Sequence, residues 1–195
     1  MVINRVFYTK VISIIFMLLL FIKPSFGHDP NKNLLANKIF EKFDLPTIGE
    51  SKSIGFYAKG CLSGGVKLSD TGPNWQIMRP SRNRNWGHPS VISYIKDLSK
   101  SVTQIGWKGL YIGDIAAPRG GPMPYGHQSH QTGLDVDIWL TPPKSLKLTR
   151  KERDKIKAIS VRKKNLREVN KFWTITHAKI LKEAALDNRV DRIFI

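Results

Sequence analysis

Residues 126–137 read GHQSHQTGLDVD, the densest cluster of chemically reactive side chains in the chain. Its two histidines and two aspartates offer imidazole nitrogens and carboxylate oxygens, which are common zinc ligands. Asp135 and Asp137 lie two apart in a segment, 134–140, whose alternation predicts a strand, so we expect them to share a face. Gly133 suits a tight turn between the histidines and that strand. The cluster predicts a metal site, although a surface hydrogen-bond network could use the same residues.

The rest of the chain predicts an α+β fold, because helical and strand patterns are mixed along one domain. The clearest helix follows Ser90, an expected N-cap, and has apolar residues at helical spacing up to Ile105. Thr149 and Glu152 have the spacing of a capping box that opens a second helix. Further helices are expected over residues 34–43 and 176–187, and short strands over residues 53–57, 110–113 and 190–195.

The N-terminal residues 1–27 have the pattern of a secretory signal. Arg5 and Lys10 precede an apolar run over residues 11–22, and a small-residue pattern ends at Gly27. The run is shorter than the roughly 20 residues of a membrane-spanning helix. We therefore expect export, a mature domain over residues 28–195 and no membrane span after cleavage, with an uncleaved anchor as the alternative.

The charge balance is strongly basic, with 32 Lys and Arg against 15 Asp and Glu in 195 residues and a net charge of +17. Such a charge indicates a polyanionic neighbour, which could be nucleic acid, an anionic membrane surface or an acidic wall polymer. Most of the excess lies in the Lys-rich residues 141–195. A basic aromatic segment could bind nucleic acid, but the export signal argues against this; it contains Trp75, Arg79, Arg82, Arg84 and Trp86.

Cys61 is the single cysteine, an odd number for an exported chain. It could be a buried free thiol or half of a disulfide whose partner lies outside this chain. A nucleophilic role is the least favoured, because no base lies nearby in the sequence.

Residues 129–137, SHQTGLDVD, resemble the signature of the penicillin-insensitive murein endopeptidases, a family of the LAS-type metallopeptidases. Asp137 follows His130 by seven positions and Gly133 follows it by three. The resemblance covers about residues 53–195 and is carried by further segments at 53–56, 60–61, 78–79, 86–89, 112–114 and 192–194.

This resemblance implies an α+β fold with a small, mainly antiparallel sheet and flanking helices. It implies a Zn²⁺ ion held by His130 and Asp137, with His127 as a possible ligand of a second ion. The implied reaction is hydrolysis of D-alanyl–meso-diaminopimelate cross-links in periplasmic peptidoglycan, with no serine acyl-enzyme. In such chemistry zinc polarises the scissile carbonyl and activates a water molecule.

The sequence lacks the C-terminal His-x-His motif that completes the zinc site in this family. The family pairs the cysteine at the position of Cys61 with one in the same C-terminal region, so both features indicate a truncated chain. Two further metal-associated positions of the family fall on Lys164 and Arg167, which cannot replace their ligands. Of the other histidines, we expect His88 to be structural or to line the substrate site, His177 to face solvent or cap a helix, and His28 to be the first mature residue.

Three further residues carry expectations about the site. Asp135 either orients a histidine or accepts a structural hydrogen bond. Arg79 and Arg119 are candidates for binding substrate carboxylates. The alternative function is that of a truncated, catalytically inactive module that binds the cell wall.

Overall fold

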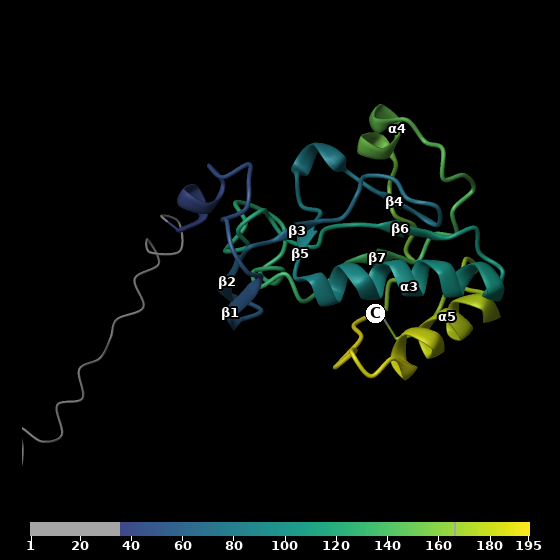
Figure 1. The fold of residues 1–195 in the computed structure, drawn as a ribbon. Coiled ribbons are helices and arrows are strands. Elements are labelled where there is room, and N and C mark those ends of the chain that lie inside the picture. Colours follow the sequence, from purple (N-terminus) through teal and green to yellow (C-terminus); the bar gives the residue numbers. More distant parts are fainter. Residues whose placement is uncertain (1–35, 166) are drawn as a thin grey trace, which may run out of the picture. The chain divides into compact units, whose positions relative to one another are not determined.

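Helix α3 (Pro89–Ile105) organises the core of the part of the chain that this computed structural model describes, residues 36–165 and 167–195 (Figure 1). Its apolar residues recur every three or four positions and are buried along one face. The N-cap is His88, whose ring nitrogen accepts a hydrogen bond from the Ser90 backbone, and Pro89 occupies the first turn. The expected cap at Ser90 was therefore wrong by two positions. The predicted end at Ile105 is confirmed, and Gly106 follows it in the left-handed conformation.

A three-stranded sheet lies beside this helix in the order β4 (Trp75–Ile77), β6 (Leu110–Ile112), β7 (Ile138–Trp139). The first pair is parallel and the second antiparallel. The predicted strand over residues 134–140 was too long, since only two of its residues belong to β7. Asp137 continues the pairing just outside the strand, because it exchanges backbone hydrogen bonds with Gly113 and Asp114.

Two antiparallel pairs complete the β structure. The hairpin β1 (Lys52–Phe56) and β2 (Lys59–Ser63) confirms the strand predicted at residues 53–57, and β3 (Val66–Lys67) pairs with β5 (Trp86–Gly87). The α+β class and the mainly antiparallel pairing are confirmed. The strands form three small sheets rather than the single sheet that was expected.

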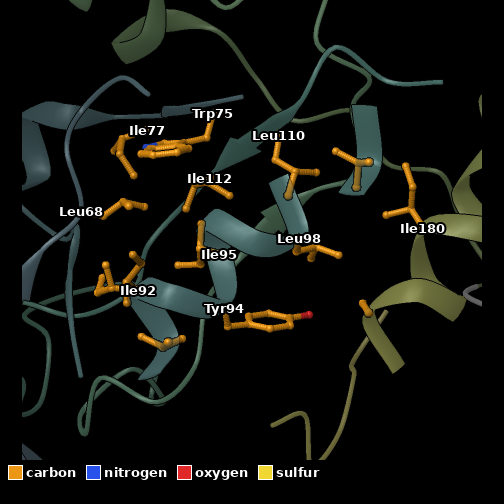
Figure 2. Close-up of a cluster of buried hydrophobic side chains, with 14 of the residues drawn as sticks. Leu68, Trp75, Ile77, Ile92, Tyr94, Ile95, Leu98, Leu110, Ile112 and Ile180 are labelled. Atoms are coloured by element: carbon orange, nitrogen blue, oxygen red, sulfur yellow. The ribbon is translucent and has the colours of Figure 1, made fainter. Parts of the chain in front are cut away.

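The hydrophobic core fills the space between α3, the three-stranded sheet and α5 (Ile175–Leu186). Figure 2 shows Ile95 and Leu98 of α3 close to Leu110 and Ile112 of β6. Ile180 of α5 belongs to the same cluster. Burying each such side chain contributes about 1.5–3 kcal/mol to stability. This packing holds β6 and β7 in place. It thereby also positions the residues that follow β6 and those that precede β7.

The C-terminal third contains the two helices that were predicted there. Helix α4 (Arg150–Lys155) begins with the expected capping box, and α5 starts one residue earlier than expected. The strand predicted at residues 190–195 was wrong: Val190 closes a turn onto Asp187, and the residues after it are exposed and have no strand partner among the described residues.

The remaining elements are short. Of the helix expected over residues 34–43, positions 36–40 are helical, and a 3₁₀ turn, η1 (Pro80–Arg82), follows β4. Among the described residues no helix has the length and apolar character to cross a membrane. The signal predicted over residues 1–27 lies outside the described residues.

Candidate metal centre

His127, His130 and Asp137 converge at one point on the loop before β7. One potential ligand atom of each lies within 4.8 Å of the others. The Asp137 carboxylate places one oxygen 3.4 Å from Nε2 of His127 and the other 3.3 Å from Nε2 of His130. Two ligands about 2.1 Å from a tetrahedral zinc ion lie roughly 3.4 Å apart. The spacing of these side chains therefore suits a metal ion.

His130 is the buried member of this group, with 2% of its surface exposed and a left-handed backbone at φ 66°. Nδ1 lies 2.9 Å from an Asp135 oxygen, yet neither ring nitrogen has a hydrogen bond of good geometry among the described residues. Buried polar atoms without a hydrogen bond are rare, and a ring nitrogen that binds a metal needs none. A left-handed non-glycine residue is also typical of functional sites.

Electrostatics at this centre favour the protonated form of His130 and the ionised form of Asp137. Burial by itself would lower the pKa of His130, but Asp135 and Asp137 outweigh it and raise the pKa to about 10. Burial likewise opposes ionisation of Asp137, but His130, His127 and Arg82 hold its pKa below the usual value. The two aspartates thus favour positive charge at the place where a metal ion would bind.

Asp135 contacts His130 twice. Its Oδ2 accepts a hydrogen bond from the His130 backbone N–H at 3.1 Å and lies 2.9 Å from Nδ1 of the same residue. The two roles considered for Asp135, orienting a histidine and accepting a backbone hydrogen bond, are therefore both compatible with its position. These contacts fix the direction in which Nε2 points, toward Asp137.

Gln131 anchors the loop and was missed in the sequence. Its buried side-chain amide donates to the carbonyls of Ala58 and Gln128, and its oxygen accepts from Gly60 N–H at 3.1 Å. The amide therefore ties the histidine loop to the β1–β2 hairpin. No local pattern could have revealed this, since Gln131 and Gly60 are 71 residues apart.

Gly133 makes the turn that the sequence predicted, with φ 69°. Its carbonyl accepts a hydrogen bond from His88 N–H at 2.9 Å, and an added Cβ would lie 2.8 Å from the Leu62 side chain. The position therefore requires glycine for both its conformation and its close packing.

A cavity of about 300 Å³ opens beside the centre and contains the first of the two predicted arginines. The cavity is lined by Arg79, the N-cap residue of η1, and by Arg82, His127, Asp137 and Trp139. Arg119 does not line this cavity: its guanidinium lies 3.7 Å from the centre of the Phe43 ring and donates to the Leu45 carbonyl. Substrate binding by Arg79 and Arg119 remains a prediction.

The other singled-out residues lie outside the metal cluster. His88 caps α3, while His177 is fully buried, bonds to Thr174 and packs between Trp107 and Trp173. The expectation that His177 faces solvent was wrong, because it fills an aromatic pocket, whereas its role at the helix start is confirmed. Lys164 and Arg167 are exposed, and Cys61 is a half-buried free thiol within the described residues.

The candidate metal centre lies within the part of the chain that is similar to known proteins. The sequence model of the family described as penicillin-insensitive murein endopeptidase matches residues 53–195. A protein of that name from Haemophilus influenzae is 37% identical over 147 residues, which is 75% of this chain and 51% of the relative. Relatives with the same name from Citrobacter koseri and Salmonella paratyphi B are 37% and 38% identical over 162 residues, which is 83% of this chain and 59% of each relative. The chain spans between half and three fifths of the length of these relatives.

Proposed function

The chain belongs to the family of penicillin-insensitive murein endopeptidases, and on this premise we propose that it is a zinc-dependent endopeptidase of peptidoglycan. The substrate bond we propose is the D-alanyl–meso-diaminopimelate cross-link between peptide stems. The observation that carries this proposal is the convergence of His127, buried His130 and Asp137, whose potential ligand atoms all lie within 4.8 Å of one another.

His130 and Asp137 would hold the zinc ion, and His127 would be a further ligand. A zinc ion bound there would supply Lewis-acid chemistry, which polarises a peptide carbonyl and lowers the pKa of a water molecule toward about 7. Nitrogen and carboxylate ligands of this kind are those that zinc prefers. Nε2 of His127 lies 3.4 Å from an Asp137 oxygen, a spacing that would allow both side chains to contact one ion.

The protein's own residues perform the positioning in this proposal. Asp135 holds His130 by its backbone N–H and faces Nδ1, so that Nε2 stays directed at the ion. Gln131 holds the loop against the β1–β2 hairpin. The adjacent cavity, with Met78 and Trp139 in its wall, gives the peptide a partly apolar surface to lie against.

The test is zinc content of the purified chain by mass spectrometry, together with turnover of a cross-linked muropeptide. We expect about one zinc ion per chain and cleavage that ends when His130→Ala or Asp137→Ala removes a ligand, while Asp191→Ala, an exposed acid elsewhere, has no effect. Zinc and muropeptide binding without cleavage would instead favour the inactive cell-wall-binding module. Binding of neither zinc nor muropeptide would contradict both functions.

We also propose that the chain acts in the periplasm, after export directed by residues 1–27. The support is the pattern of basic, apolar and small residues in this segment. N-terminal sequencing of protein recovered from the periplasm should begin at His28. Recovery of the uncleaved chain from the cytoplasm would contradict this location.

A further inference from the structure

We propose that the cavity beside the metal centre contains a carboxylate-binding subsite in which Arg82 determines specificity and Asp114 positions it. This inference rests on the proposed function, because it names a chemical group of the peptide that the enzyme recognises. The argument proceeds from the contacts of Arg82, from the charge balance of the cavity and from the chemistry of the cross-link.

Arg82 is anchored by Asp114, and part of its side chain is exposed in the cavity. Its Nη1 donates to Oδ2 of Asp114 at 3.0 Å, and Asp114 is 4% exposed. The Arg82 side chain itself is 26% exposed and lines the cavity that also contains His127 and Asp137. A guanidinium has five N–H donors in a planar fork, so this arrangement leaves donors available to a carboxylate in the cavity.

Asp114 is shared by two cations. Buried Arg84 donates to the same oxygen at 2.8 Å and is further fixed by the Tyr125 carbonyl and by the Tyr125 ring, 4.5 Å from its guanidinium. One carboxylate facing two guanidinium groups leaves an excess positive charge. Because Arg84 is the buried partner, the available charge is that of Arg82.

The rest of the cavity adds to this excess. Arg79 also lines it, and its guanidinium has no ion-pair partner among the described residues. The acids in the lining are Asp114, already shared, and Asp137, which would be a zinc ligand. A cavity with these charges attracts an anion, and its field is strengthened by the low dielectric of its walls.

The proposed cross-link supplies an anion at the required place. In the diaminopimelate residue, the carbon that bears the scissile amide nitrogen also bears a free carboxylate. That carboxylate must therefore lie only a few bonds from the metal ion when the amide is positioned for hydrolysis. Arg82 and Asp137 line the same cavity, so the arginine and the ion would face neighbouring groups of one substrate.

The backbone couples the subsite to the metal centre. The Asp137 N–H donates to the Asp114 carbonyl at 2.9 Å, so the residue that holds Arg82 also holds the metal ligand. η1, which carries Arg82, follows directly from the left-handed Arg79. The backbone at the start of η1 and the contact with Asp114 therefore both place Arg82 at the cavity.

The experiment compares two peptides that correspond to the acceptor product, so cleavage does not interfere. Both contain diaminopimelate, and they differ in that the carboxylate next to the free amine is either free or a carboxamide. Binding to the zinc-loaded full chain is measured by calorimetry for the wild type and for Arg82→Gln, Arg82→Lys, Asp114→Asn and the control Arg192→Gln. Arg192 is an exposed arginine that does not line the cavity and pairs with Asp191.

We expect the wild type and Arg192→Gln to bind the free carboxylate about tenfold or more tightly than the carboxamide. Arg82→Gln should reduce this ratio to about one, Arg82→Lys should retain part of it, and Asp114→Asn should lower it although Arg82 is still present. Melting curves identify any variant that fails to fold. If Arg82→Gln fails to fold, Arg82→Lys still tests whether the ratio of the two affinities depends on this side chain.

A ratio that is unchanged in Arg82→Gln, or a wild type that does not distinguish the two peptides, would overturn the subsite. This outcome is separable from failure of the proposed function, which is read from hydrolysis of the cross-link. If the wild type discriminates between the two peptides but does not hydrolyse the cross-link, the subsite is supported and the endopeptidase function is rejected. If it hydrolyses the cross-link but does not discriminate between the peptides, the function is supported and the subsite is rejected.

Discussion

Asp135 is placed to orient His130, one of the proposed metal ligands. It contacts both the backbone N–H and Nδ1 of His130. Partners of this kind fix the ring orientation of a metal-binding histidine and raise its basicity. The carboxylate oxygens of Asp135 are thus part of the machinery although they do not belong to the cluster of potential ligands.

We predict that Asp135→Asn lowers zinc affinity by about 10- to 100-fold, because the amide removes the negative charge beside Nδ1. Affinity is measured by competition with a chromophoric chelator, and Asp97→Asn, which changes an exposed aspartate paired with Arg189, is the control. Equal affinities for the wild type and Asp135→Asn would show that the contact with Nδ1 does not support metal binding.

Gly133 provides a second prediction at this scale. Gly133→Ala should destabilise the protein by about 1–3 kcal/mol more than Gly49→Ala, measured by urea denaturation. Both glycines have positive φ, but an added Cβ at Gly49 meets nothing within 4 Å, whereas at Gly133 it meets Leu62 and the Gly87 backbone. Alanine is strained less at φ 69° than at the φ of 113° at Gly49, so a larger loss at Gly133 must come from packing. A loss at Gly133 no larger than that at Gly49 would contradict this expectation.

Single residues were predictable from the sequence where the chemistry is local. The spacing of His130, Gly133 and Asp137 predicted a metal site, and the structure brings the side chains of His130 and Asp137 together and gives Gly133 the expected turn. Gln131 and Arg82 could not be assigned, because their roles depend on partners 71 and 32 residues away. His177 was misplaced because the two tryptophans that bury it come from different segments.

At the scale of elements, short segments that flank the sheet carry the functional side chains. η1 carries Arg82 and is fastened to α4, because the Ser81 backbone N–H and hydroxyl both donate to Asp154 at 3.1 and 2.8 Å. Slight burial opposes ionisation of Asp154, but these hydrogen bonds and the nearby Arg150 and Arg153 hold its pKa below the usual value. The contact therefore strengthens when the carboxylate is ionised.

Asp154→Asn should destabilise the protein at pH 7 by less than about 1 kcal/mol, because the group is exposed and screened. A depressed pKa in the folded state gives stability that is present above the unfolded pKa of about 3.9 and lost as the pH falls below it. The free energies of unfolding of the wild type and Asp154→Asn, measured with denaturant between pH 2 and 7, should therefore become equal at the acid end. A difference that is constant with pH would indicate that the charge of Asp154 is not involved.

Elements were predicted best where periodicity and caps agree. The pattern from Val91 to Ile105 has both a helical period and a terminating glycine, and α3 matches it closely. The run at residues 190–195 has apolar residues but lacks a partner strand in the described structure, so strand propensity alone was misleading. The alternation at residues 134–140 overestimated the length of β7, although Asp137 still exchanges backbone hydrogen bonds with Gly113 and Asp114.

At the scale of the whole molecule, the proposed metal ion would stabilise a loop to which other parts of the chain are attached. Its proposed ligands sit on a loop that is fixed by the β1–β2 hairpin and by the residues after β6. A ligand that binds only the folded state raises stability by mass action. The stability of the whole domain should therefore report on the occupancy of the site.

We predict that zinc at about 100 times its Kd raises Tm by about 5–10 °C over protein treated with a chelator. Adding zinc back should restore the higher Tm, and His130→Ala should show one Tm under both conditions. His88→Ala is the matched control, since this histidine caps α3 and lies outside the cluster. A chelator-insensitive Tm in the wild type would contradict zinc binding at this centre.

The hydrogen bonds of Gln131 to the β1–β2 hairpin also bear on the order of folding. The loop can reach its final form only after a segment of 71 residues has closed, and contacts of such sequence separation tend to form late. An ion that binds this loop would then stabilise the native state more than the transition state for folding. Its kinetic effect would appear as slower unfolding, with the folding rate little changed, so that the metal would prolong the lifetime of the folded domain rather than help to create it.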